Sequence, residues 1–232
     1  LVPTRELQQQ LTACGYEKLG ILERGIDAKL FNPQHRSAAL RARLGIQPQQ
    51  LLVTLVTRMA QEKNLDLAFE AFRAIQQQIP DARFLLVGDG PERKRLQDAH
   101  PDCLFAGMRT GTDLAEHYAS GDLFLYPSTS ETFGNVVMEA MASGLPVVTF
   151  DYAAAREHIR NGENGMAAPL DDNAAFITAS LALAKDAELR KRMGAAATET
   201  AHNLSWERVI QRLHNTIQSV LYEVRHETAT SA

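Results

Sequence analysis

The sequence is poor in cysteine. Its 232 residues include two, Cys14 and Cys103, which lie far apart and have no metal-ligand spacing. This scarcity argues against a disulfide-rich secreted scaffold and favours a reduced, cytoplasmic protein, although the two thiols could form one bridge. Long apolar runs are also missing, since none approaches the roughly 18 residues of a membrane-spanning helix.

The sequence has no large excess of either charge. Its formal net charge is −4, from 24 Lys and Arg against 28 Asp and Glu. Bulk electrostatics therefore give no reason to expect nucleic acid or an anionic membrane as partner. The composition is 45% hydrophobic and 22% charged, which is typical of a globular protein with a sizeable core. Because the chain begins at Leu1 without Met, we expect a fragment or an excised domain.

From Leu51 onward, strand-like and helix-like segments alternate. Apolar, β-branched runs predict six strands at 51–57, 82–87, 103–106, 123–126, 146–150 and 165–168. Helical patterns lie between them at 65–78, 91–99, 114–119, 134–143 and 156–159. This alternation predicts an α/β fold with a doubly wound, mostly parallel, Rossmann-like sheet and helices on both faces. Ligands of such sheets bind at the carboxyl ends of the strands, where the strand order reverses.

The two ends of the chain are expected to be helical. A helix capped by Thr4 runs to Cys14, and a connector punctuated by Pro33 leads to a helix at 36–44. After the sheet, helices are expected at 173–184, 187–202 and 206–224, followed by a polar, frayed tail from Arg225.

The stretch from Ser128 to Val148 reads as a loop, a helix and a strand. Short polar residues and Gly134 precede the helix, so the backbone N–H groups of its first turn can hold an anion such as phosphate. Glu131 and Glu139 flank this helix start. A carboxylate beside a phosphate repels it unless the carboxylate faces hydroxyl groups of a ribose or a sugar. From spacing alone, two solvated glutamates on a surface helix are the more common explanation.

Other candidates also follow predicted strands. Arg58 and Lys63 suit phosphate oxygens, although loop residues of these types are often merely solvated. The turn 88–91 lacks the three glycines of a dinucleotide fingerprint, so we expect it only to shape a cleft wall. Gly107, Met108 and Arg109 could line a base pocket, or Met108 could be core and Arg109 solvated.

The stretch from Ser128 to Val148 resembles the signature of the family-4 glycosyltransferases, which are retaining enzymes of the GT-B fold. The resemblance covers residues 1–224, with the basic pair, the Gly-Xaa-Gly-Pro turn and the two glutamates in matching order. It implies the C-terminal, donor-binding half of such an enzyme. Residues 1–36 would then be the tail of an N-terminal domain and the linker, 37–204 the nucleotide-sugar-binding Rossmann-like domain, and 205–232 a crossing helix and polar tail.

The resemblance also implies roles for the candidate residues. Arg58 and Lys63 would bind the donor diphosphate and, with Glu131, form the catalytic set. Glu131 would bind hydroxyls of the transferred sugar, and Glu139 those of the ribose. The remaining donor-binding residues are Gly107, Met108 and Arg109 at the base, and Thr132, Phe133, Gly134, Asn135 and Val136 at the diphosphate. No metal-ligand cluster is visible, so we expect no metal and no cofactor beyond the nucleotide sugar.

The implied reaction moves a hexose from GDP-mannose or a UDP-hexose to a lipid or glycan acceptor. Residues 150–158, which resemble bacterial glycolipid mannosyl- and glucosyltransferases, suggest these donors. The acceptor site would lie in the N-terminal domain, so we expect the fragment alone to be inactive. The full enzyme is expected to be cytoplasmic, with peripheral association at the inner face of the membrane.

Several alternatives remain at this stage. The family favours front-face departure and attack, but the sequence leaves open a covalent mechanism with Glu131 as nucleophile. A GT-B sugar-nucleotide epimerase would bind the same donor without an acceptor. A nucleotide-binding module without transfer activity is disfavoured by the presence of both glutamates and the basic pair. A nicotinamide-dependent dehydrogenase is disfavoured because the three-glycine fingerprint is missing after the first strand.

Overall fold

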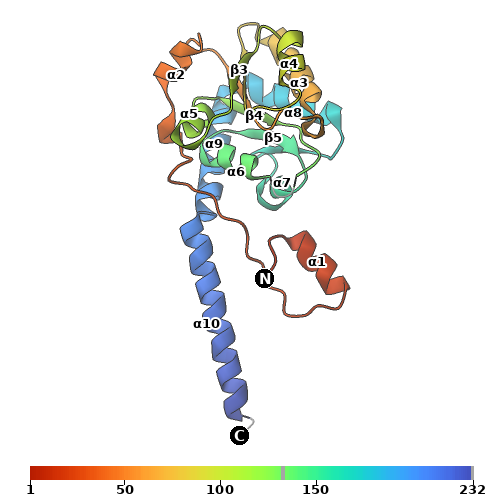
Figure 1. Ribbon diagram of the computed structural model, residues 1–232, viewed down its shortest axis with the longest axis vertical. Helices are drawn as coiled ribbons and strands as arrows, with labels where there is room; N and C mark the ends of the chain where they lie inside the picture. The colour runs from red at the N-terminus through yellow and green to blue at the C-terminus, as the bar shows by residue number, and fades with distance from the viewer. Residues whose placement is uncertain (132–133, 231–232) are drawn as a thin grey trace. The chain divides into compact units, whose positions relative to one another are not determined.

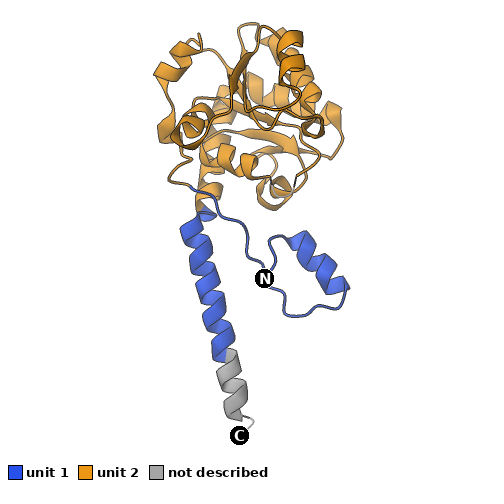
Figure 2. Ribbon diagram, in the orientation of Figure 1, with its two compact units in different colours: residues 1–27, 203–232 blue, residues 28–202 orange. Residues whose placement is uncertain are grey.

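The computed structural model describes residues 1–131 and 134–230, with side chains described as far as residue 222. Residues 28–202 form one compact unit, which contains the whole sheet, and residues 1–27 form a second unit with the chain from residue 203 onward (Figure 2). Residues 1–36 were predicted to be the tail of an N-terminal domain and the linker, and 28–36 of these belong to the unit with the sheet. The division of a full enzyme at 36/37 and 204/205 stays a prediction.

Six parallel strands form the sheet of the larger unit, in the order β3-β2-β1-β4-β5-β6. Figure 1 labels β3, β4 and β5 of this sheet. The doubly wound α/β prediction is confirmed, and each strand lies within one residue of its expected ends. The strand order reverses between β1 and β4, which is where such sheets bind ligands. The strands are β1 (Leu52–Val56), β2 (Arg83–Val87), β3 (Leu104–Gly107), β4 (Leu123–Tyr126), β5 (Val147–Phe150) and β6 (Met166–Ala168).

Helices cover both faces of this sheet. On one face, Phe69 and Phe72 of α3 and Phe176 of α8 pack with alternate strand residues such as Val53 and Phe84. On the other face, Tyr118 of α5 packs against Phe124 of β4. The helices are α2 (Ala38–Arg43), α3 (Leu65–Gln78), α4 (Arg93–Ala99), α5 (Gly111–Ala119), α6 (Asn135–Ala142), α7 (Ala154–His158), α8 (Asn173–Lys185) and α9 (Ala187–Asn203), with 3-10 turns η1 (Pro33–His35) and η2 (Gln61–Lys63).

Four helix starts lie two or three residues from those expected, and the first of them is α2, which begins at Ala38 instead of Arg36. Helix α4 begins at Arg93 instead of Pro91, because the Glu92 N–H donates to the Met59 carbonyl of a neighbouring loop (3.0 Å). Helix α5 begins at Gly111, three residues earlier than predicted, and α7 begins at Ala154. The cap at Gly144 is confirmed, since its φ of +84° is left-handed.

The smaller unit contains α1 (Arg5–Ala13) and α10 (Trp206–Thr230). Thr4 caps α1 as predicted, and α10 continues past residue 224, where a frayed tail was expected. The segment before the larger unit is bonded to the start of α10: Ile26 N–H donates to Leu204, and Trp206 N–H donates to Ile26. A search of the described residues finds no helix with the length and apolar character needed to cross a membrane.

Candidate functional site

The loops that follow β1, β2 and β3 are joined by backbone hydrogen bonds at the carboxyl edge of the sheet. Met59 N–H donates to the Asp89 carbonyl (2.9 Å), and Gly88 N–H donates to the Gly107 carbonyl (2.9 Å). A Cβ on Gly88 would lie 1.9 Å from the Thr57 carbonyl oxygen, so only glycine permits this approach. The glycine-rich turn therefore shapes the wall of this edge.

Lys63 and Glu131 meet at the point where the strand order reverses. Lys63 ends η2 after β1, Glu131 lies in the loop after β4, and Lys63 Nζ is 2.7 Å from Glu131 Oε1. The ammonium also donates to the Ser130 carbonyl (3.0 Å). Only 15% and 14% of the two side chains are exposed. A pair this buried needs further hydrogen bonds to offset the loss of water.

Two hydroxyl groups supply these hydrogen bonds. Ser128 Oγ donates to Glu131 Oε1 (2.7 Å), and the Tyr126 hydroxyl donates to the same oxygen. Burial raises the pKa of Tyr126, and its bond to Glu131 raises that pKa further, so the hydroxyl stays protonated and acts as donor. The Glu131 carboxylate therefore faces one ammonium and two hydroxyl groups of the protein itself.

Glu139 lies on α6 and is held by a different tyrosine. The Tyr118 hydroxyl, fully buried on α5, donates to Glu139 Oε2 (2.8 Å). Burial raises the pKa of Glu139, and the hydrogen bond from Tyr118 opposes this shift. Helix α6 begins after Gly134, whose φ of +92° is left-handed, so Asn135 and Val136 lie in the first turn, where backbone N–H groups lack helical partners.

The remaining predicted residues have different surroundings. Arg58 is 69% exposed and lies 3.9 Å from Glu62, a weak surface pair that leaves it available to a ligand. Met108 is 65% exposed, so it does not belong to the core. Arg109 donates to the Ala106 carbonyl (2.8 and 3.1 Å) and to Asp113 (3.1 Å), so in this structure it folds back onto the end of β3. The predicted donor residues Thr132 and Phe133 lie outside the described residues.

The loop after β5 completes this edge. The Tyr152 hydroxyl donates to the Glu131 carbonyl (3.4 Å), and Ala153 has the dihedral angles φ 50° and ψ −129°, which L-residues rarely adopt. Sequence reasoning missed Tyr118, Tyr126 and Ser128 as partners of the glutamates. The position of Tyr126, a hydroxyl-bearing residue that ends an apolar strand, could have indicated its role.

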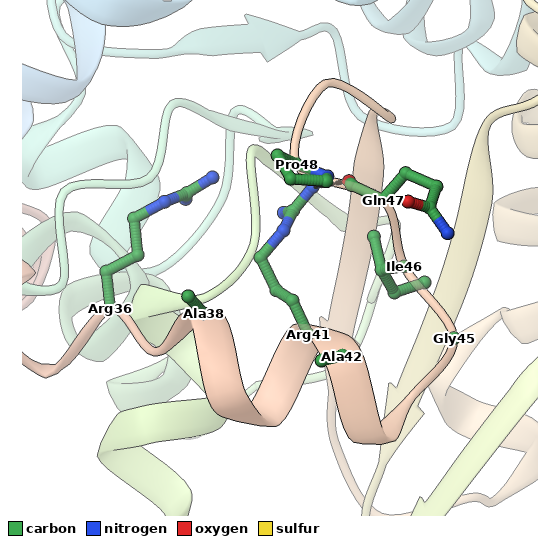
Figure 3. Close-up of a pocket in the computed structure, with 8 residues that line it drawn as sticks. All are labelled: Arg36, Ala38, Arg41, Ala42, Gly45, Ile46, Gln47 and Pro48. Atoms are coloured by element: carbon green, nitrogen blue, oxygen red, sulfur yellow. Dashed lines mark hydrogen bonds between the residues drawn. The ribbon is translucent and has the colours of Figure 1, made fainter.

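A separate hollow of about 460 Å³ lies near the amino ends of β1 and β4 (Figure 3). Arg41, which crosses it, donates to the carbonyls of Gln47 (3.1 Å), Gln50 (2.6 Å) and Ser120 (2.9 Å) and to Asp122 Oδ2 (3.0 Å). The two terminal nitrogens of the guanidinium hold loops together, whereas its buried Nε has no partner among the described residues. Its lining residues are Arg36, Ala38, Arg41, Ala42, Gly45, Ile46, Gln47 and Pro48.

Within the part of the chain that the structure describes, no three or more His, Cys, Asp or Glu side chains are arranged to hold a metal ion. The polar groups at the carboxyl edge include the ammonium of Lys63, the guanidinium of Arg58, the carboxylates of Glu131 and Glu139, and hydroxyls. This set suits a ligand that carries both anionic and hydroxyl groups.

Comparison with known proteins agrees with this chemistry. The family model described as glycosyl transferases group 1 matches residues 50–186. The chain belongs to the family-4, group 1 glycosyltransferases. This match contains both glutamates, Arg58 and Lys63.

Two relatives show how much of a family member is present. The sulfoquinovosyl transferase SQD2 of Arabidopsis thaliana is 34% identical over 224 residues, which cover 93% of this chain and 43% of that protein. A GDP-mannose-dependent alpha-mannosyltransferase of Corynebacterium glutamicum is 34% identical over 214 residues, covering 92% and 50%. The chain therefore spans about half the length of these curated relatives, consistent with the expected C-terminal half of a GT-B fold.

A solved structure supports the fold. The crystal structure of Anabaena Alr3699/HepE in complex with UDP superposes with a TM-score of 0.77 at 23% identity, covering 94% of this chain and 63% of that one. At this identity the likeness establishes the GT-B-type architecture alone.

Proposed function

We propose that this chain is the donor-binding half of a retaining glycosyltransferase. The full enzyme would transfer a hexose from GDP-mannose or a UDP-hexose to a lipid or glycan acceptor bound by an N-terminal domain. The observation that carries the proposal is the Lys63–Glu131 pair, which joins a cation to a hydroxyl-binding carboxylate where the strand order reverses. The relative that depends on GDP-mannose supports the first of these donor classes.

Lys63 is suited to connect the two halves of a nucleotide sugar. An ammonium has three donors, and two of them meet Ser130 and Glu131, which leaves one for a phosphate oxygen. Arg58 adds a second cation, and the first turn of α6 adds backbone N–H groups. As the sugar departs, negative charge grows on the β-phosphate, and preorganised donors stabilise that change.

The surroundings of Glu131 bear on the reaction route. Three hydrogen bonds, one of them from an ammonium, engage Oε1 of Glu131, and an oxygen whose lone pairs accept hydrogen bonds is less available to attack a carbon atom. This favours front-face departure and attack, with Glu131 binding sugar hydroxyls. Glu139 would bind the ribose hydroxyls, with its own orientation set by Tyr118.

Calorimetry with GDP, UDP, GMP, UMP and NAD tests this proposal. We expect one nucleoside diphosphate to bind more tightly than its monophosphate and more tightly than NAD. Lys63→Ala should weaken that binding by about 1–3 kcal/mol, because a charge-assisted bond to phosphate is lost. The matched control is Lys94→Ala, which removes an exposed lysine paired with Asp98 and should leave the affinity unchanged. Tighter binding of NAD than of every nucleoside diphosphate would refute the donor-site assignment.

A second pair of variants separates the glutamates. Glu139→Ala should weaken binding of the nucleoside diphosphate and of the nucleotide sugar equally, because both ligands carry the ribose. Glu131→Ala should weaken mainly the nucleotide sugar, by about 1–3 kcal/mol. Equal losses for both ligands in the Glu131 variant would contradict its assignment to the sugar.

A further inference from the structure

Tyr126 has a fixed position at the end of β4. Its side chain is buried, with 3% of the residue exposed, and its ring stacks on Phe124 at 6.0 Å between centroids. Phe124 packs in turn against Tyr118 at 5.6 Å. Burial and stacking on Phe124 restrict the Tyr126 ring, so the direction of its hydroxyl is set by the core of the sheet and not by a surface loop.

The donors to Glu131 are distributed unevenly between its two carboxylate oxygens. Lys63, Ser128 and Tyr126 all donate to Oε1. Among the described residues, no hydrogen bond to Oε2 is found. Of the three donors, Lys63 has a flexible side chain and Ser128 lies in the same loop as Glu131, whereas Tyr126 belongs to the strand. Tyr126 is thus the rigid reference against which the carboxylate is oriented.

We propose that Tyr126 is a positioning residue that holds Glu131 by Oε1 and so presents Oε2 to a hydroxyl group of the donor sugar. This inference rests on the proposed function and goes beyond it, because it names a residue that touches no ligand yet sets the affinity for the sugar portion of the donor. Ser128 supports the same oxygen from the loop, at 2.7 Å.

The molecule contains a matched control for this role. Tyr118 donates to Glu139 Oε2 at 2.8 Å, so the same hydroxyl-to-carboxylate contact occurs beneath the second glutamate. Replacing either tyrosine with phenylalanine removes one hydroxyl and retains the ring. The two variants therefore make the same chemical change under glutamates that are assigned to different parts of the donor.

The test measures Kd by calorimetry for GDP, GDP-mannose, UDP and UDP-glucose, using the pair whose base the wild-type chain binds. In Tyr126→Phe, we expect the affinity for the nucleotide sugar to fall about three- to tenfold relative to that for the nucleoside diphosphate. In Tyr118→Phe, both affinities should fall together, with their ratio unchanged. Ser128→Ala should lower the ratio in the same direction as Tyr126→Phe, and it tests the proposal even if Tyr126→Phe fails to fold.

The outcomes separate the inference from the proposed function. A changed ratio in Tyr126→Phe or Ser128→Ala, with the ratio of Tyr118→Phe at the wild-type value, supports the positioning role. The wild-type chain could bind both ligands while the Tyr126 and Ser128 variants lose equal affinity for the nucleoside diphosphate and the nucleotide sugar. That result would mean that these residues are merely structural, and it would overturn the inference alone. Absence of binding of every nucleotide and nucleotide sugar to the wild-type chain would overturn both.

Discussion

The two edges of the sheet each hold a carboxylate among cations, but they satisfy it differently. At the amino edge, Asp122 Oδ1 accepts from Arg36, and Oδ2 accepts from Arg41 and from the Leu52 N–H. At the carboxyl edge, the donors to Glu131 converge on Oε1.

The difference indicates how to distinguish a structural cluster from a binding one. At Asp122 both oxygens are occupied, and the two terminal nitrogens of Arg41 each meet two acceptors, so among the described residues the guanidinium has only its buried Nε without a partner. At the carboxyl edge, the ammonium of Lys63 has three donors and makes two hydrogen bonds among the described residues, and 69% of the Arg58 side chain is exposed. Unused hydrogen-bonding capacity, more than the presence of charge, marks the candidate site.

Removal of the amino-edge carboxylate of Asp122 is the most severe test of this difference. Asp122→Ala would leave Arg41, with 5% of its side chain exposed, without its carboxylate. Loss of one partner of a buried ion pair costs about 3–5 kcal/mol, so we expect the free energy of unfolding to fall by that amount. Urea denaturation followed by circular dichroism would measure it.

Arg36→Ala provides the control, because 45% of this side chain is exposed and it pairs with the same carboxylate. We expect a loss of at most about 1 kcal/mol. Neither variant should change nucleotide affinity in the folded protein. A stability loss below about 1 kcal/mol in Asp122→Ala would show that the cluster is not the structural element described here.

At the carboxyl edge, we expect the ionised carboxylate of Glu139 to lower the free energy of unfolding. Burial raises the pKa of Glu139 above its ordinary value. A carboxyl whose folded pKa is raised stabilises the folded state below its unfolded pKa, and this contribution is lost as the pH rises through the folded pKa. Glu139→Gln keeps an acceptor for Tyr118 without the charge, so at neutral pH the variant should be more stable than wild type while binding nucleotide less tightly.

Thermal denaturation from about pH 4 to pH 8 would check this sign. The stability advantage of Glu139→Gln should grow as the pH rises and disappear at acid pH, where the wild-type carboxyl is protonated. A variant that is less stable than wild type at neutral pH would show that the ionised carboxylate is favourably solvated or paired, and the two edges would then not differ in this respect.

Much of this arrangement could be predicted from sequence because it is local. Apolar, β-branched runs predicted the six strands, and Gly144 predicted the end of α6. The rule that ligands bind where the strand order reverses placed the basic residues and the glutamates at one edge. The paired contacts could not be predicted, because Lys63 and Glu131 are 68 residues apart, and Tyr118 and Glu139 are 21 apart. Such contacts depend on side-chain directions that only the packed sheet defines.

The start of helix α4 was misplaced because it, too, depends on a contact between distant parts of the sequence. Helix α4 was predicted to start at Pro91, since proline favours a first helical position, but the turn before it is bonded to Met59 of another loop. The base contact of Arg109 stays a prediction, and in this structure its guanidinium donates to Ala106 and Asp113. At the start of α4, a tertiary hydrogen bond prevailed over a propensity that the sequence alone could indicate.

The smallest predicted effect concerns backbone strain at the carboxyl edge. Ala153 has φ 50° and ψ −129°, and strain of this kind costs about 1–3 kcal/mol. Ala153→Gly should relieve it, and after the greater backbone entropy that glycine loses on folding, we expect a net gain of about 1 kcal/mol in the free energy of unfolding. Ala155→Gly, two residues later within α7, should instead destabilise the protein by about 0.5–1 kcal/mol. Urea denaturation of the two variants should therefore give opposite signs. A loss of stability in both variants would show that Ala153 is not strained. Stability changes of opposite sign would show that the edge with the proposed site keeps a backbone conformation that lowers the stability of the protein.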